Sequence, residues 1–213
     1  MPGLLQHGPD TARLLGSREW EVLRIQEGVP APDRELTLDH NPLEAALWHT
    51  VSFDKGCYVG QETIARLKTY DGLKQQLWGV SFVEAPGAAL EQVSDEALLG
   101  AKLFVERGAG IADDEAQETD AEALAAGRGD GRITSVLLIE GEEREIRCLG
   151  YVRMKAGGAL LGAADGTLVT AKGEGLPAGG IQGRLCDLAY ATRSVCLLPL
   201  HARASVFVRD WRV

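Results

Sequence analysis

The segment RITSVLLIEGEEREIRCLGYVR, residues 132–153, decides the fold. Two runs rich in apolar and β-branched residues, 132–139 and 144–153, flank a short polar stretch at 140–142 with glycine at its centre. Two such runs joined by a few residues that include glycine predict a β-hairpin. The hairpin therefore predicts an antiparallel sheet in this part of the chain.

Further strands are predicted on both sides of this hairpin. Residues 75–83 and 101–106 are compact apolar runs, and residues 160–168 contain one or two short strands around an Asp-Gly turn. Several short strands with turn signals favour a small antiparallel barrel. We expect that barrel to occupy residues 74–170.

Residues 17–73 carry helical patterns. The first helix is predicted to begin with Ser17 as N-cap and to end at Gly28. A second, short helix opens at 41–44, where an asparagine N-cap, a proline and a glutamate follow the order of a helix start. A third is predicted over 61–68. The fold class is therefore α+β, with short helices packed beside a C-terminal antiparallel β-barrel.

Three further regions do not fit either pattern. Residues 1–16 are rich in glycine and proline and predict a poorly ordered start. Residues 108–130 form an acidic, alanine-rich insertion, which favours a solvated helix or loop over a metal site. Residues 171–213 break the strand pattern and contain more bases than acids, so we expect an irregular tail.

Composition narrows the function classes. The chain has 213 residues and a formal charge of -9, which argues against direct nucleic-acid binding because such proteins present a basic face. The four cysteines contain no C-x-x-C pair, so no metal site is predicted. No run approaches the roughly 18 apolar residues that span a membrane. We expect a cytoplasmic protein without a membrane partner, in which His40 and His49 are surface or capping residues.

The segment KGCYVGQE, residues 55–62, concentrates reactive chemistry. Lys55 lies two positions before the thiol of Cys57 and can favour its thiolate, as can the start of a following helix. Gly56 and Gly60 permit backbone angles and close approaches that a side chain forbids. The alternative is a simple turn with a small buried cysteine.

Residues 55–62 resemble the K-G-C-Y-x-G-Q-E signature of the folate-binding YgfZ-type proteins, relatives of the aminomethyltransferase of the glycine cleavage system. Residues 20–30 are similar to the W-x-x-L-x-I-E-A-G-I-P segment of that family. Residues 131–135 and 149–153 match its G-x-[IV]-T-S and L-G-Y-V-R segments. The resemblance spans residues 18–168 and implies the C-terminal half of that architecture.

The resemblance implies tetrahydrofolate as the cofactor and Trp20 as a folate contact. Without the resemblance, Trp20 would be interpreted as an aromatic residue of the hydrophobic core. Gln26 stands where the family pattern has glutamate, and an amide cannot accept the two hydrogen bonds that a carboxylate can. Fewer than twenty residues precede the tryptophan helix, so we expect an incomplete folate cavity unless another chain supplies the missing wall.

By resemblance, the chain is expected to be an accessory protein in iron–sulfur cluster assembly or repair that affects tRNA-modifying iron–sulfur enzymes. Its expected partners are iron–sulfur proteins or assembly factors. An aminomethyltransferase-like enzyme is the alternative, but the region holding the catalytic aspartate of those relatives is not found here. A truncated, non-catalytic binding module is a further alternative. The residues expected to act are Cys57 as the functional thiol, Lys55 as its modulator, Gly56 and Gly60 as turn formers, Tyr58 as a wall, and Gln61 and Glu62 as hydrogen-bonding residues at the helix start.

Overall fold

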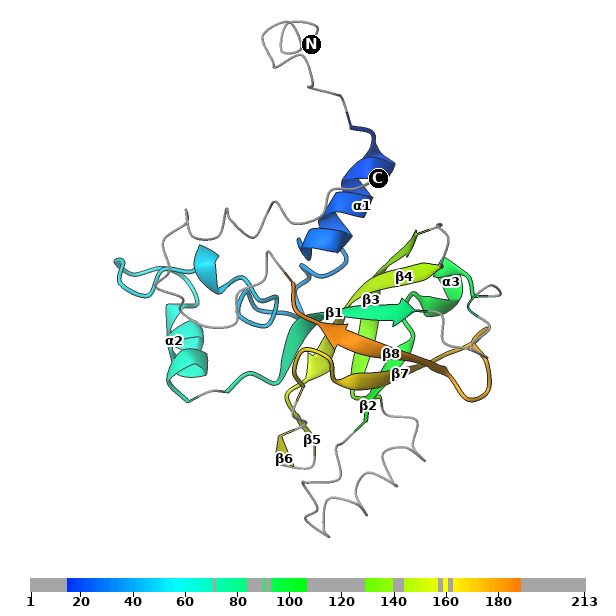
Figure 1. Ribbon diagram of the computed structural model, residues 1–213. Helices are drawn as coiled ribbons and strands as arrows, with labels where there is room; N and C mark the ends of the chain where they lie inside the picture. The colour runs from blue at the N-terminus through cyan, green and yellow to red at the C-terminus, as the bar shows by residue number, and fades with distance from the viewer. Residues whose placement is uncertain are drawn as a thin grey trace, which may run out of the picture.

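The computed structural model describes residues 15–70, 72–83, 90, 93–106, 129–139, 144–156, 159–160 and 163–188. It contains three α-helices, a 3₁₀ helix and eight strands in the described ranges (Figure 1). The helices are α1 (Ser17–Glu27), η1 (Trp48–Thr50), α2 (Gln61–Thr69) and α3 (Asp95–Leu98). The strands are β1 (Gln75–Val83), β2 (Lys102–Val105), β3 (Gly131–Ile139), β4 (Glu145–Arg153), β5 (Lys155–Ala156), β6 (Ala159–Leu160), β7 (Leu168–Lys172) and β8 (Ile181–Cys186).

Six strands close into an antiparallel barrel in the order β1-β4-β3-β2-β7-β8, and β5 and β6 form a separate two-stranded ribbon. The predicted hairpin is the β3–β4 pair, which carries a bulge between Ile133 and Ser135. Figure 1 shows α1 and α2 outside the barrel, with the first turns of α1 projecting away from it. The predicted α+β class with a C-terminal barrel is confirmed.

The barrel interior holds the main hydrophobic core. Alternate residues of each strand point inward, as the pattern of β8 shows, where Ile181 and Leu185 are buried and Gln182 and Arg184 are exposed. Removing such apolar surface from water is the main stabilising contribution, about 25 cal/mol for each Å². The largest fully buried side chains of this core are Phe82, Leu90, Leu98, Leu103, Ile133, Ile146 and Leu185.

A second hydrophobic cluster attaches α1 to the outside of the barrel. Ile25 packs with residues of β1 and β4, including Leu77 and Leu149, and with Leu188. Gly28 ends α1 in the left-handed conformation, with φ of 79°, and a Cβ there would lie 2.5 Å from the Cβ of Leu188. Glycine is therefore required both to end this helix and to let Leu188 approach.

A third cluster joins α2 to the barrel. Ile64 is buried with Leu43 and Leu73, and Met154 at the end of β4 packs against them. The face of α2 that carries Ile64 and Leu67 is therefore its inward face. Among the described residues, no helix combines the length and apolar character needed to cross a membrane.

The predicted irregular tail is wrong over residues 171–188. Strand β7 continues to Lys172, and β8 pairs with β7 on one side and with β1 on the other, which closes the barrel. The alternation in 181–186 is weak in the sequence, because a glycine occupies one of its inward positions. The remainder of the tail, 189–213, lies outside the described residues, as do 1–14 and most of the predicted acidic insertion.

Two local predictions also need correction. Gly16, not Ser17, is the N-cap of α1, and no side chain caps it. The residues from Asn41 form a capping box, in which Asn41 Oδ1 accepts a hydrogen bond from the Glu44 N–H at 3.0 Å and Glu44 Oε2 accepts one from the Asn41 N–H at 3.2 Å. The chain nevertheless continues as turns, because Ala46 has a positive φ of 58°, which ends any helix there. The one or two short strands predicted over 160–168 correspond to β6, which ends at Leu160, and β7, which begins at Leu168.

Candidate functional site

The signature segment, residues 55–62, is a surface loop that leads into α2. Gly60 precedes the helix with φ of 86°, a conformation that glycine adopts without steric cost. The Gln61 side chain closes the turn, because its Oε1 accepts a hydrogen bond from the Tyr58 backbone N–H at 3.1 Å. Glu62 is exposed in the first turn of α2, where a carboxylate interacts favourably with the helix dipole.

Cys57 is exposed in this loop, so the alternative of a small buried cysteine is wrong. The ammonium group of Lys55 lies 4.8 Å from the centre of the Tyr58 ring, a cation–π arrangement that holds both side chains on the same side of the loop. A Cβ at Gly56 would meet no atom within 4 Å, so nothing approaches this glycine closely. The effect of Lys55 on the Cys57 thiol remains a prediction.

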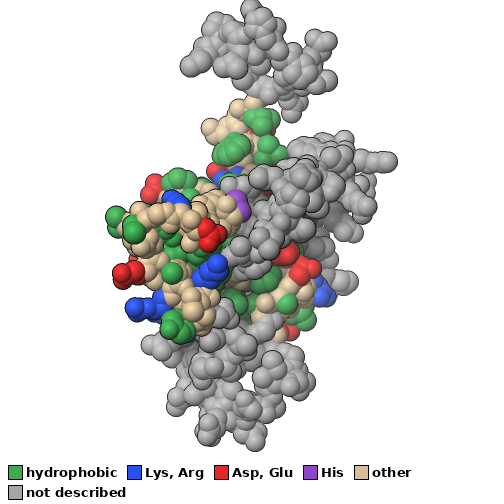
Figure 2. All heavy atoms as spheres, turned by 90° about the vertical axis from the view of Figure 1, so that its left-hand side faces the viewer, with side chains coloured by type: hydrophobic (Ala, Val, Ile, Leu, Met, Phe, Trp, Pro, Cys, Tyr) green, Lys and Arg blue, Asp and Glu red, His purple; other side chains and the backbone are tan. Residues whose placement is uncertain are grey.

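The described cysteines differ sharply in accessibility. Burial raises the pKa of the Cys148 thiol, and the charge of Asp95 raises it further. Burial also raises the pKa of Cys186, which is half-buried and lies near Asp165. Among the cysteines in the described ranges, Cys57 is therefore the most exposed. The face that carries this loop and α2 presents acidic, basic and hydrophobic side chains interspersed (Figure 2).

The two residues that the resemblance assigns to folate lie apart from this loop in the sequence, on α1. Trp20 is 55% exposed, so its interpretation as a core aromatic is wrong. It lies one helical turn before the buried Arg24. Gln26 is half-buried and lines a small cavity of about 190 Å³ together with Cys186 and Leu188.

A buried ion pair fixes the loop that follows α1. Arg24 is 2% exposed and Glu35 is fully buried, and Arg24 Nη1 lies 3.1 Å from Glu35 Oε2. The same carboxylate oxygen accepts a hydrogen bond from the Ala31 backbone N–H at 3.0 Å, and Arg24 Nη1 also donates to the carbonyl of Val29. On the solvent side, a hydrogen bond from Arg24 lowers the pKa of Glu21. The loop 29–36 is therefore attached to α1 by charge as well as by packing.

The other oxygen of Glu35 connects this loop to the barrel. Thr134 and Ser135 on β3 each donate a hydrogen bond of 2.6 Å to Glu35 Oε1, and Ser135 Oγ in turn accepts one from Arg24 Nη2 at 2.8 Å. The Tyr151 hydroxyl donates to the Glu35 backbone carbonyl at 2.8 Å. The threonine and serine of the G-R-I-T-S segment and the tyrosine of the L-G-Y-V-R segment thus bind the same buried glutamate.

His40 is not the surface or capping residue that was expected. Its ring stacks on the Tyr151 ring with centroids 3.8 Å apart, and its Nδ1 lies 2.9 Å from Gln75 Nε2. Stacking on a side chain of β4 places His40 beside the barrel wall. Because the nearest neighbours of His40 come from β1 and β4, local sequence spacing could not have placed it.

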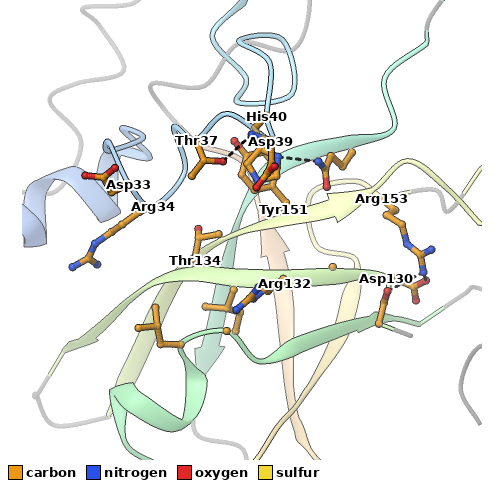
Figure 3. A pocket seen from close by; sticks show the side chains of 16 residues that line it. Asp33, Arg34, Thr37, Asp39, His40, Asp130, Arg132, Thr134, Tyr151 and Arg153 are labelled. Carbon is orange, nitrogen blue, oxygen red and sulfur yellow. Dashed lines mark hydrogen bonds and ion pairs between the residues drawn. The ribbon is translucent and has the colours of Figure 1, made fainter. Parts of the chain in front are cut away.

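These contacts create a cavity of about 870 Å³ between the loop 33–40 and the outer face of β3 and β4 (Figure 3). The stacked His40 and Tyr151 lie on one side, and Arg132 and Thr134 extend from β3 (Figure 3). The charged side chains that line it are Asp33, Arg34, Asp39, Asp130, Arg132 and Arg153.

Two of the arginines at this cavity already have acidic partners. Arg153 Nη2 lies 3.2 Å from Asp130 Oδ1, and Arg34 Nη1 lies 3.7 Å from a Glu21 oxygen. Arg132 is exposed, and no ion pair with a described acidic residue is found for it. The cavity therefore offers one uncompensated guanidinium beside an aromatic pair, which suits a ligand that combines an anionic group with a flat ring.

No signature residue lines this cavity or the smaller one beside Gln26. The structure therefore does not bring Cys57 together with Trp20 or Gln26 in one described cavity. Within the described ranges, no group of three or more His, Cys, Asp or Glu side chains is placed to hold a metal ion.

No family model matches the chain. Individual proteins do match part of it. The chain is 56% identical over 78 residues to a chloroplastic protein of Arabidopsis thaliana named "Putative transferase At1g60990", a match that covers 36% of the chain and 18% of that protein.

Two further relatives carry more specific names. The chain is 43% identical over 56 residues to the tRNA-modifying protein YgfZ of Buchnera aphidicola, covering 25% of the chain and 18% of that protein. It is 39% identical over 69 residues to an aminomethyltransferase of Caldanaerobacter subterraneus, a match that covers 32% of the chain and 18% of that protein. The matched part thus spans less than a fifth of each of these curated relatives. On these matches part of the chain is similar to YgfZ-type proteins and to aminomethyltransferases.

Proposed function

We propose that the chain is a YgfZ-type accessory protein that supports iron–sulfur cluster assembly or repair, and through it tRNA-modifying iron–sulfur enzymes, with Cys57 as its functional thiol. The observation that carries the proposal is the exposure of Cys57 in a preformed turn, while Cys148 is buried and Cys186 is half-buried. A thiol acts as a nucleophile or a metal ligand only when solvent and partners can reach its sulfur. The identity to proteins named YgfZ supports the same assignment.

A single cysteine limits the role that Cys57 can have. A stable iron–sulfur cluster is normally held by four protein ligands, and the described residues offer no metal-binding group beside this loop. Cys57 is therefore proposed to make a transient contact with iron or sulfur carried by a partner protein. The mixed surface around α2, in which charged and apolar side chains alternate, suits a transient protein contact (Figure 2).

Tetrahydrofolate is the cofactor that the family implies, and the residues assigned to it do not enclose a ligand of that size. Ligand cavities for molecules of this kind span about 300–1,000 Å³. Gln26 lines a cavity of only about 190 Å³, and Trp20 lines neither this cavity nor the one of about 870 Å³. Trp20 and Gln26 alone thus form at most one wall of a folate site. We propose that a partner chain packed against α1 supplies the opposite wall.

Complementation tests the proposed function. A strain that lacks its YgfZ-type protein should regain the activity of iron–sulfur enzymes when it expresses the wild-type chain, and should not regain it with Cys57→Ser. Cys186→Ser is the matched control, because it removes a half-buried thiol outside the signature and should behave as the wild type. Equal rescue by Cys57→Ser and the wild type would remove the thiol from the mechanism.

Folate binding needs a separate measurement. Equilibrium dialysis of the isolated chain with tetrahydrofolate should show weak binding, with a Kd well above the micromolar range, because only one wall is present. Tight binding that Trp20→Ala abolishes would contradict the shared-site proposal and would mean that the chain encloses folate by itself.

A further inference from the structure

The strand register builds one wall of the cavity of about 870 Å³ from side chains of β3 and β4. Arg132 on β3 is directly opposite Tyr151 on β4. Ile133 and Val152, the next residues of the two strands, are buried in the barrel core, so Arg132 and Tyr151 lie on the outer face of the sheet. Directly opposite residues have Cβ atoms about 4.5–5.5 Å apart. A positive charge and an aromatic ring are therefore neighbours on this wall, and both line the cavity (Figure 3).

His40 adds a second aromatic layer over Tyr151. The two rings are stacked with 25° between their planes, and His40 also lines the cavity. The Gln75 side chain, 2.9 Å from His40 Nδ1, fixes the rotation of the imidazole. In the part of the chain that the structure describes, His40 stacks on no aromatic ring other than that of Tyr151. The opposite face of the imidazole can therefore stack on a flat ring of a ligand.

The guanidinium of Arg132 has a defined position although it has no acidic partner. A Cβ at Gly100 would lie 3.2 Å from Arg132 Nη2, so the guanidinium rests against the backbone of residue 100. Gly100 has φ of 81°, and the absence of a side chain leaves this space to the guanidinium. No ion pair among the described residues involves Arg132. Arg132 is therefore available to an anionic group of a ligand.

Two of the three carboxylates that line the cavity lie at its ends. Asp130 is engaged by Arg153 at 3.2 Å. Asp33 lies next to Arg34 in sequence, and Figure 3 shows both beside α1, at the end of the cavity opposite to Asp130. The middle of the cavity is thus left to the arginine and the stacked rings of the first wall and to the third carboxylate.

This third carboxylate, Asp39, supplies hydrogen-bond acceptors next to the stacked rings. Asp39 directly precedes His40, is exposed, and is drawn beside the two rings in Figure 3. It forms no ion pair with any described residue. An ionised carboxylate can accept two hydrogen bonds side by side. The ring N–H and the amino group on one edge of guanine are a matching pair of donors.

We propose that this cavity binds a purine nucleoside monophosphate, for which guanosine 5′-monophosphate (GMP) is the best match. Its phosphate binds Arg132, its base stacks on His40, and the donor edge of the base binds Asp39. An exposed guanidinium attracts a single carboxylate only weakly, whereas a phosphate monoester carries a charge of about −1.5 to −2 at neutral pH. The cavity volume of about 870 Å³ lies within the range of about 300–1,000 Å³ that is typical of small-molecule sites.

The proposed ligand is a free nucleotide rather than RNA. A protein that follows an RNA backbone presents many cations to the phosphates. This cavity offers one guanidinium without an acidic partner, on a chain of net charge -9. The cavity shares no residue with the Cys57 loop, so the site extends beyond the proposed function.

Isothermal titration calorimetry of the full chain with GMP tests this site. Saturable binding at a stoichiometry of one is expected. Guanosine, which lacks the phosphate, and ribose 5-phosphate, which lacks the base, should each bind at least about tenfold more weakly, because each loses one charge-assisted or stacking contact. AMP should bind several-fold more weakly than GMP, because adenine does not present the paired donors.

Variants assign each part of the ligand to one side chain. Arg132→Gln should weaken GMP binding about tenfold or more and leave guanosine binding unchanged. Asp39→Asn should weaken GMP binding several-fold and leave ribose 5-phosphate binding unchanged. His40→Ala should weaken GMP binding about fivefold or more, the size of a lost stacking contact. The matched control is Arg184→Gln, which removes an exposed arginine from β8 and should leave the affinity unchanged.

The proposal is wrong if GMP shows no saturable binding, or if Arg184→Gln weakens binding as much as Arg132→Gln, because the effect would then be general charge. Tighter binding of a short single-stranded RNA than of GMP, also lost in Arg132→Gln, would overturn the assignment to a free nucleotide. Displacement of GMP by an equal concentration of tetrahydrofolate would instead make this cavity a folate site and would also overturn it. Unchanged thermal unfolding of each variant confirms that the barrel is intact.

Discussion

The substitution Glu35→Gln tests the structural role of the buried network. Glu35 is fully buried, and its two oxygens accept four hydrogen bonds, from Arg24, Ala31, Thr134 and Ser135. Glutamine has the same shape but presents one oxygen and one NH₂ group. Wherever the NH₂ group replaces one of the two carboxylate oxygens, it would face hydrogen-bond donors instead of accepting from them. The buried Arg24 would also lose the negative charge of Glu35, its fully buried partner.

Removing one partner of a buried ion pair typically costs about 3–5 kcal/mol. Arg24 keeps an ion pair with the partly exposed Glu21 at 2.7 Å, so we expect the lower end of this range, about 3 kcal/mol. For a domain of this size each kcal/mol shifts the melting temperature by about 2–4 °C, which predicts a decrease of about 6–12 °C for Glu35→Gln. Urea unfolding followed by circular dichroism gives the free energy directly.

The double variant Arg24→Met/Glu35→Leu is the control. Replacing a whole buried ion pair by apolar residues is often neutral or stabilising, so the double variant should be more stable than Glu35→Gln. If Glu35→Gln lowers the free energy of unfolding by less than about 1 kcal/mol, the reasoning is refuted, because the carboxylate would then not be required to hold the loop. A double variant as unstable as the single one would show that hydrogen bonds, rather than the unpaired charge, dominate the loss.

Three further predictions follow from individual residues. Gly28→Ala should destabilise the chain by more than about 1 kcal/mol, because residue 28 has φ of 79° and the added Cβ would collide with Leu188. The control Gly56→Ala has open space around the added Cβ and should change the free energy of unfolding by less than about 0.5 kcal/mol in the same unfolding experiments. Iodoacetamide should modify Cys57 long before Cys148, whose pKa is raised by burial, and peptide mass spectrometry that found Cys148 modified first would refute this. Because the pKa of Glu21 is lowered, its contribution to stability is present above the pKa of an unfolded glutamate, about 4.3, and is lost as the pH falls through its lower folded value. Glu21→Gln should therefore flatten the acid part of a stability–pH curve, and an unchanged acid slope would contradict this.

The sequence was sufficient for the elements whose signal is local. The hairpin at 131–153 could be predicted because two apolar runs are separated by a short glycine-containing turn. Gly28 could be recognised as a helix end because glycine adopts the left-handed conformation that most residues avoid. The strand β8, by contrast, has one glycine and two polar residues in six positions, and it is a strand because closing the barrel requires a partner for both β1 and β7.

The buried network around Glu35 and the arrangement of residues on the barrel surface could not be predicted from the sequence, because they depend on tertiary contacts. The contact of Glu35 with Ser135 joins residues one hundred positions apart, and the opposition of Lys102 to Arg132 depends on a strand register that no local pattern specifies. The resemblance identified the G-R-I-T-S segment, and the structure adds that its threonine and serine hold a buried carboxylate. Arg24 and Glu35 could have been noticed as a charged pair beside a helix end, but nothing in their spacing indicates burial.

The most direct test of the central claim is the level of an iron–sulfur-dependent tRNA modification, measured by mass spectrometry of nucleosides from cells that lack their YgfZ-type protein. Cells expressing the wild-type chain or Cys186→Ser should restore the modified nucleoside, and cells expressing equal amounts of Cys57→Ser should remain at the level of the empty vector. Full restoration by Cys57→Ser would contradict the claim that the exposed thiol of the signature loop carries the function.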